Sequence, residues 1–238
     1  MIRNMTRTQL LAATALGSTI GFLVPGAAAA AESAYDWSGF YAGLGLTGVR
    51  STAEADFTRL SGTDNIPGSV QLPALGDGGT IRFGENWQAG RFVYGVEADG
   101  TQLTLNGYAH GSNYTVGDSL STLLSLRARF GMTFDRLMVY GTTGLVLGQA
   151  SFRADIDDSS NGTPASASAM STGALAGLGV EVAVTDHIRL TVGADYYAMA
   201  PLHGHGVTDS GYFVSQSTYS GDYTPRGLIF ETGVNLHF

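Results

Sequence analysis

The chain has 238 residues, of which 44% are hydrophobic, 13% are charged and 34 are glycine, and this composition is too apolar for a disordered protein. It contains no cysteine, which excludes a disulfide framework, a thiolate zinc site and a cysteine nucleophile. The formal net charge of −8 and the lack of a basic stripe argue against nucleic acid as a partner.

Residues 1–31 have the pattern of a secretory signal peptide. Arg3 and Arg7 precede an apolar run over residues 10–24, and small residues follow. The run is about 15 residues long, whereas a membrane-spanning helix needs about 20. Cleavage at the end of this segment leaves residues 32–238 as one domain, with a formal charge of −10 because two arginines are lost. No run of 18 apolar residues follows, so the exported chain is either soluble outside the cytoplasm or a transmembrane barrel.

The exported part consists of segments whose apolar and polar residues alternate with the period of a β-strand. We predict eight strands, over residues 40–48, 80–88, 92–104, 120–134, 137–152, 172–185, 188–199 and 228–238. Their connections alternate between short turns and long polar segments, at residues 50–79, 106–118, 153–171 and 201–225. This rhythm predicts an all-β fold, an eight-stranded antiparallel up-and-down transmembrane β-barrel with short periplasmic turns and four long extracellular loops.

The strand over residues 120–134 indicates which face points outward. Large apolar residues alternate there with Arg127 and Arg129, and each arginine would cost roughly 2–4 kcal/mol if it faced lipid near the midplane. Both arginines are therefore expected to point into the barrel. The same parity turns Glu97 and Asp99 inward on the neighbouring strand, which predicts ion pairs between the two strands. A soluble sandwich would require the opposite arrangement, with apolar side chains inside.

The remaining strands complete a predicted polar network in the lumen. Its expected members are Glu97, Asp99, Arg127, Arg129, Glu181, Asp195 and Glu231. Eight strands leave an interior only just wide enough for side chains, so we expect a packed polar plug. The alternative is that the same residues line a narrow solute path.

Two features do not follow this scheme directly. Glu85 falls on the outward face of its strand, so it lies either at the membrane interface or on a strand whose register is shifted. Gly43, Gly45 and Gly48 match G-x-G-x-x-G, but no helix follows them, so glycine packing inside a narrow barrel explains them better than a dinucleotide site.

Several blocks resemble the small outer-membrane β-barrel proteins of alphaproteobacteria, a porin-like family related to the OmpA transmembrane domain. The blocks are residues 37–43, 86–90, 92–99, 125–131, 140–144, 177–181 and 233–238. The resemblance implies location in the bacterial outer membrane, with outer-membrane lipid and lipopolysaccharide as partners. It also implies that the terminal strand is read by the barrel assembly machinery, through Phe230, Val234, Leu236 and Phe238.

The predicted function is that of a structural envelope protein without a wide pore, which displays surface loops and needs no cofactor. One alternative is a loop that binds haem, metal or a host surface through His203 and His205. The acids Asp155, Asp157 and Asp158 lack the spacing of a calcium loop. A lipid-hydrolysing enzyme is not predicted, because no nucleophile elbow surrounds the serines near the two histidines.

Overall fold

The computed structural model describes residues 35–62, 66–112, 114–156, 163–209 and 216–238, so the predicted signal peptide lies outside the described residues. The strands are β1 (Gly39–Ser61), β2 (Ser69–Ala89), β3 (Phe92–His110), β4 (Tyr114–Phe134), β5 (Leu137–Ile156), β6 (Ala165–Ala183), β7 (Ile188–Met199), β8 (Leu202–Asp209), β9 (Gln216–Thr224) and β10 (Arg226–His237). Within these described ranges, no helix is long and apolar enough to cross a membrane.

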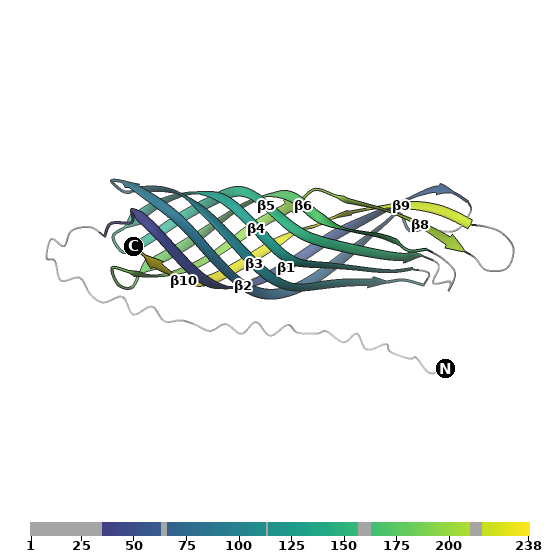
Figure 1. The fold of residues 1–238 in the computed structure, drawn as a ribbon, viewed down its shortest axis with the longest axis horizontal. Coiled ribbons are helices and arrows are strands. Elements are labelled where there is room, and N and C mark those ends of the chain that lie inside the picture. The colour runs from purple at the N-terminus through teal and green to yellow at the C-terminus, as the bar shows by residue number, and fades with distance from the viewer. Residues whose placement is uncertain (1–34, 63–65, 113, 157–162, 210–215) are drawn as a thin grey trace, which may run out of the picture. The chain divides into compact units, whose positions relative to one another are not determined.

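Eight of these strands form a closed antiparallel ring. The order is β10-β7-β6-β5-β4-β3-β2-β1, and pairing between β10 and β1 closes it (Figure 1). The predicted eight-stranded up-and-down barrel is therefore confirmed. By the rule for bacterial outer-membrane barrels, the short turns after β2, β4 and β6 lie on the periplasmic side. Figure 1 shows β8 and β9 at the opposite end from the C-terminus.

The predicted bounds of the four long loops are wrong, because most of those residues extend the strands. Residues 50–61 and 69–79 continue β1 and β2, and β3 and β4 are joined by residues 111–113 alone. Within the segment 201–225, the described residues of β8 and β9 pair as a hairpin, and β9 also pairs with the outer part of β1 between Glu54 and Ser61. The ring thus continues as a β-sheet wall well beyond its membrane-facing part.

Each long strand reverses its polarity part-way along. On β3, Glu97 and Asp99 point inward and are buried in the membrane-facing half, whereas Leu103 and Leu105 take the inward positions further out. The outward residue Gln102 begins a polar exterior at the same level. The physical reason is the change of solvent: the lower wall faces lipid and the outer wall faces water, so the outer part buries its apolar side chains inside.

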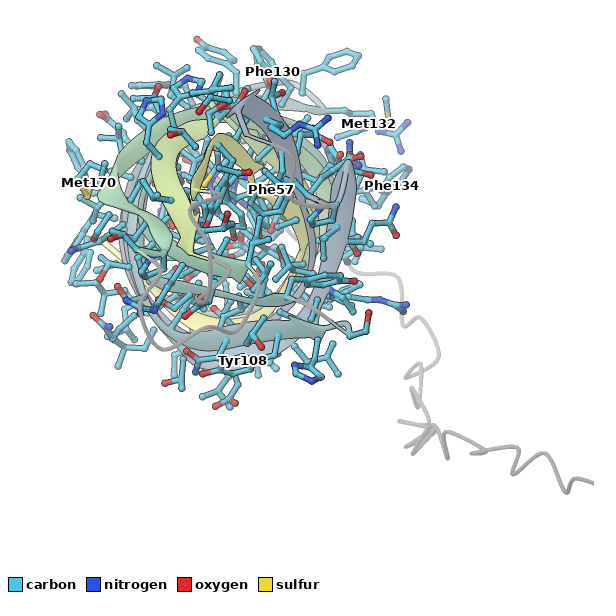
Figure 2. The ribbon with its side chains drawn as sticks, turned by 90° about the vertical axis from the view of Figure 1, so that its right-hand side faces the viewer. Phe57, Tyr108, Phe130, Met132, Phe134 and Met170 are labelled. Atoms are coloured by element: carbon cyan, nitrogen blue, oxygen red, sulfur yellow. The ribbon has the colours of Figure 1, made fainter. Side chains whose placement is uncertain are left out.

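The view along the barrel shows this arrangement directly. Phe130, Met132 and Phe134 of the lower wall project outward from the ring, whereas Phe57 of the outer part projects into it (Figure 2). Irregularities in strand pairing accompany the reversal, between Gln102 and Leu105 on β3. A matching shift occurs between Leu120 and Thr122 on β4, and such bulges let a strand change which face a residue occupies.

Candidate functional site

The seven side chains predicted for the lumen are all buried inside the barrel. Arg127 of β4 lies at the centre of this group. Its guanidinium contacts Asp99 on the neighbouring strand and reaches across the lumen to Asp195 on β7, with Nη1 to Oδ2 at 2.8 Å. Glu97 lies 3.5 Å away and Glu231 lies 3.9 Å away. One arginine therefore joins strands on opposite sides of the barrel.

Arg129 forms the second cross-barrel connection. Its Nη2 donates to Glu181 on β6 at 2.7 Å, and its Nη1 donates to Glu97 on β3 at 3.3 Å. The guanidinium also lies over the rings of Tyr41 and Tyr140, at 5.3 and 4.0 Å from their centroids. The charge is thus enclosed by carboxylates and aromatic faces, which is an arrangement that stabilises a buried guanidinium.

Glycines make room for the two tyrosines. A Cβ on Gly84 would collide with the ring of Tyr41, and a Cβ on Gly179 would collide with the ring of Tyr140. Each aromatic ring therefore lies flat against a glycine of the neighbouring strand. This close approach explains part of the glycine content of the inward face.

Two further arginines, Arg82 and Arg189, belong to the lumen and were not predicted as members. Arg82 donates to Glu231 at 3.0 Å, and both side chains are buried. Arg189 lies 3.9 Å from Glu181. The alternation of β2 and β7 could have revealed both positions. Arg82 is three residues from the outward Glu85, so it faces inward, and Arg189 alternates with the outward residues of β7.

The segment before β1 packs against two short turns at the periplasmic mouth, where Tyr35 and Trp37 form a plug. Trp37 is fully buried and donates through Nε1 to the carbonyl of Asp135 in the β4–β5 turn at 3.0 Å. Tyr35 donates to the carbonyl of Asp186 in the β6–β7 turn at 3.1 Å. Arg189 lies beneath both rings, 4.7 Å from the Trp37 centroid. Sequence reasoning missed this plug because the segment has no strand periodicity.

The interior of the outer part is apolar. All ten strands contribute side chains to its buried cluster, which includes Phe57, Leu72, Leu105, Phe152 and Tyr219. Burying a large apolar side chain contributes roughly 1.5–3 kcal/mol. A cluster of this size makes the outer wall a folded extension of the barrel.

One polar contact ties the β8–β9 hairpin to this cluster. Tyr223 of β9 donates its hydroxyl to Asp118 of β4 at 2.5 Å, and both side chains are buried above the lipid-facing band. Burial raises the pKa of Asp118 above its ordinary value, against the opposing effect of the Tyr223 hydroxyl. Burial and the adjacent Asp118 carboxylate raise the pKa of Tyr223.

The two candidate histidines lie on the outward face of β8. Both are exposed, and Nδ1 of His203 lies 2.6 Å from Oδ1 of Asp222 on β9. His205 is paired in register with Ser220. Among the residues that the structure describes, no group of three or more metal-ligating side chains occurs. Asp155 lies near Arg153, whereas Asp157, Asp158, Ser210 and Ser215 are outside the described residues.

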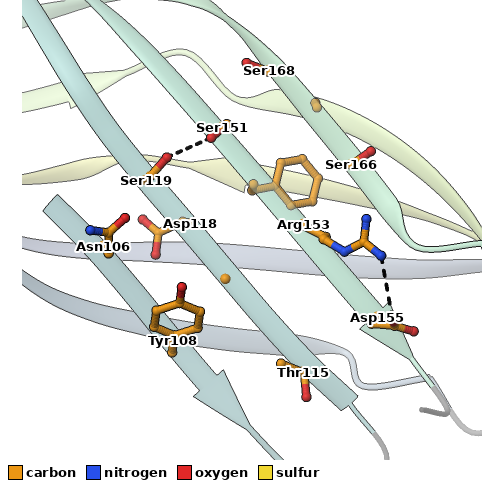
Figure 3. Close-up of a pocket in the computed structure, with 13 residues that line it drawn as sticks. Asn106, Tyr108, Thr115, Asp118, Ser119, Ser151, Arg153, Asp155, Ser166 and Ser168 are labelled. Atoms are coloured by element: carbon orange, nitrogen blue, oxygen red, sulfur yellow. Dashed lines mark hydrogen bonds and ion pairs between the residues drawn. The ribbon is translucent and has the colours of Figure 1, made fainter. Parts of the chain in front are cut away.

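A polar groove of about 690 Å³ crosses the outer face of β3, β4, β5 and β6 above the lipid band. Tyr108 and Arg153 stand on either side of Gly117, each paired with it in register (Figure 3). Two residues nearer the membrane-facing half of β4 and β5, Ser119 and Ser151 share a hydrogen bond of 2.8 Å. The groove therefore combines an exposed aromatic ring, the guanidinium of Arg153 with the carboxylate of Asp155 4.0 Å from it, and a row of small polar groups.

The four residues predicted as an assembly signal all face outward on the closing strand. Phe230, Val234 and Leu236 are exposed on the lipid-facing side of β10, and Phe238, directly after the strand, is exposed as well. Phe238 is next to the seam, where its backbone N–H donates to the carbonyl of Phe40 at 2.9 Å.

A closed antiparallel barrel with an apolar exterior band and a charged interior defines the class of bacterial outer-membrane β-barrels. The family model described as outer membrane protein beta-barrel domain matches residues 20–238, and the chain belongs to this family. Its location is the outer membrane.

Named relatives come from alphaproteobacteria. The chain is 27% identical over 190 residues to the 31 kDa outer-membrane immunogenic protein of Brucella melitensis, which covers 76% of this chain and 79% of that protein. It is 31% identical over 161 residues to the 22 kDa outer membrane protein of Rhizobium leguminosarum bv. viciae, which covers 66% of this chain and 62% of the relative.

Among solved structures, the outer membrane protein OprG from Pseudomonas aeruginosa is similar, with a TM-score of 0.52 and 14% sequence identity. The match covers 84% of this chain and 96% of OprG. At this identity the likeness concerns the fold alone.

Proposed function

We propose that this protein is a structural outer-membrane barrel that contributes to envelope integrity and has no wide pore. The observation that carries the proposal is the set of cross-lumen ion pairs, above all the contact from Arg127 on β4 to Asp195 on β7. The plug around Trp37 and the apolar interior around Phe57 close the channel below and above these pairs. A solute would have to pass three successive obstructions, which argues against even a narrow solute path.

Planar-bilayer recording of the purified, refolded protein tests this proposal. The expected result is a bilayer whose conductance stays at the baseline. Steady ohmic openings of nanosiemens size would contradict the closed lumen. A variant with Asp195→Ala and Trp37→Ala removes a contact from two of the three barriers, so it provides a positive control for detecting leak currents.

The outer groove favours a second role, contact with the sugars of lipopolysaccharide. Aromatic rings and hydroxyl groups suit a carbohydrate, and Arg153 suits an acidic substituent on it. The groove starts just above the lipid band, where the sugars of a lipid in the outer leaflet begin. Thermal stabilisation of the barrel by lipopolysaccharide should fall in Tyr108→Ala and Arg153→Ala. It should persist in Arg50→Ala, which removes an exposed arginine from β1.

The closing strand supports a further part of the proposal, which concerns assembly of the barrel in the membrane. The aromatic end of the chain resembles the segment that barrel assembly machinery reads in this family, and its alternate residues Phe230, Val234, Leu236 and Phe238 present apolar side chains outward near the seam. This supports recognition of the closing strand before the barrel is sealed.

A further inference from the structure

Glu85 is an acidic residue on the lipid-facing wall. On β2 it lies between the outward residues Phe83 and Trp87, and across the sheet it pairs in register with Phe40 and Val96. Those four side chains are exposed and apolar, whereas Glu85 is only partly exposed. The register is regular through this region, so no strand shift removes the carboxylate from the outer face.

The carboxylate adjoins a groove of about 570 Å³ in the outer wall. Small residues form its floor, namely Ala42, Gly84 and Ala98, and phenylalanines, including Phe83 and Phe238, stand at its sides. The volume lies in the range of small-molecule binding pockets, about 300–1,000 Å³. Its lining is suited to a hydrocarbon chain.

The depth of Glu85 matches the edge of the periplasmic leaflet. Trp87 belongs to the aromatic girdle, and its ring stacks on Tyr94 at 5.7 Å. Two residues along a strand advance about 7 Å, which becomes about 5 Å of depth for a strand tilted by about 40°. The carboxylate therefore lies just inside the girdle, within reach of a phospholipid headgroup.

No side chain neutralises this charge. Glu85 forms no ion pair with any residue that the structure describes, and the chain contains no lysine. The four arginines at membrane depth, Arg82, Arg127, Arg129 and Arg189, all point into the lumen. Two exposed arginines lie at the periplasmic end, where Arg91 lies over the ring of Phe134 and Arg136 pairs with Asp186, so a second copy could bring a cation only from these turns. A carboxylate that faces lipid is costly without a partner, so an ammonium-bearing lipid headgroup is the partner that this position favours.

We propose that Glu85 and the adjoining groove bind an aminophospholipid of the periplasmic leaflet. The ammonium of a phosphatidylethanolamine headgroup pairs with the Glu85 carboxylate, and one acyl chain lies in the groove over Ala42 and Ala98. This site is independent of the closed lumen, and it would fix the depth of the barrel relative to the inner leaflet.

Trp87 provides a built-in reporter for this site. Of the two tryptophans in the chain, Trp37 is buried in the plug and Trp87 faces lipid beside Glu85. The mature protein is refolded into phosphatidylcholine vesicles that contain a small, equal mole fraction of acyl-brominated phosphatidylethanolamine or phosphatidylglycerol. Bromine quenches tryptophan fluorescence on contact. We expect brominated phosphatidylethanolamine to compete for the site at least threefold better than brominated phosphatidylglycerol.

Three variants test which residues determine the preference for phosphatidylethanolamine over phosphatidylglycerol. Glu85→Gln should bring the ratio close to one, and Ala42→Leu, which fills the groove without changing charge, should lower it. Asp77→Asn removes another outward acid of β2, above the lipid band, and should keep the wild-type ratio. Unheated gel mobility verifies that each variant is folded.

Equal quenching by both headgroups in the wild type would overturn the proposal, as would an unchanged preference in Glu85→Gln. Quenching that falls for both lipids as the protein-to-lipid ratio rises would also overturn it, because a second copy would then cover the groove.

Discussion

At the scale of single residues, the lumen depends on arginines that each serve several carboxylates. A buried ion pair need not add net stability, because both charges lose their hydration. Removing one partner is a different matter, since the remaining charges stay buried without compensation. Arg127 is the most connected of these groups, with Asp99, Asp195, Glu97 and Glu231 around it.

Replacing Arg127 by methionine should therefore lower the free energy of unfolding by about 3–5 kcal/mol. Urea titration of the refolded barrel, followed by the heat-modifiable gel shift, measures the change. Arg50→Met removes an exposed arginine from the outer face of β1 and should change the free energy by less than about 0.5 kcal/mol. Similar losses in the two variants would contradict the assigned role of Arg127.

The contact with lipid explains which lumen residues could be predicted from the sequence. Lipid excludes the arrangement in which charged side chains face outward, so the alternation of β4 and β3 alone predicts that Arg127 and Glu97 point inward. It also predicts that they pair with each other between the two neighbouring strands. The partner Asp195 could not be identified, since the strand tilt and stagger decide which residues meet across the barrel. The plug residue Trp37 lies outside any repeating pattern, so only the folded chain reveals its position.

At the scale of strands, the membrane-facing halves were predictable and the outer halves were not. β7 coincides with its predicted range, because each outward residue between Ile188 and Met199 is apolar or aromatic. In β1, the outer residues alternate between small inward alanines at 53 and 55 and the polar outward residues Glu54 and Asp56. This segment has low hydropathy, and its burial depends on distant partners in β2 and β9. Local pattern therefore indicates a loop where the structure has a strand.

The β8–β9 hairpin should be sensitive to pH through Asp118. The raised pKa means that the folded barrel binds this proton more tightly than the unfolded chain does. Its contribution to stability is therefore fully present at pH values below the ordinary aspartate pKa and is lost as pH rises through the folded-state value. The charge that Asp118 gains as the pH rises is buried between β4 and β9, so weakening is expected first where the hairpin packs on β4.

Hydrogen exchange of the β9 amides, corrected for intrinsic rates, should accelerate between pH 4 and pH 8. Asp118→Asn keeps a hydrogen-bond acceptor without the titratable charge and should remove most of this acceleration. His203→Ala removes the exposed histidine that contacts Asp222 of β9, and the acceleration should persist in this variant. An unchanged pH dependence in Asp118→Asn would assign the effect to another group.

At the scale of the whole molecule, one barrel is adapted to two solvents. The lower wall turns apolar side chains to lipid and encloses charges, and the outer wall does the reverse in water. Backbone pairing of β1 with β10 closes the membrane-facing half, whereas in the outer half β1 pairs with β9 of the β8–β9 hairpin. An open seam would expose unpaired backbone groups to lipid, which the bilayer cannot satisfy.

Deleting Phe238 should consequently reduce the yield of assembled barrel several-fold. The deletion removes the backbone hydrogen bond to Phe40 at the end of the seam and the terminal aromatic side chain at the periplasmic girdle. Phe238→Tyr keeps both and should assemble almost like the wild type. His203→Ala alters an exposed residue of β8, away from the seam, and should leave the yield unchanged. The fraction of outer-membrane protein that migrates faster without heating gives the yield, and equal yields for the deletion and His203→Ala would contradict the role of the terminal residue.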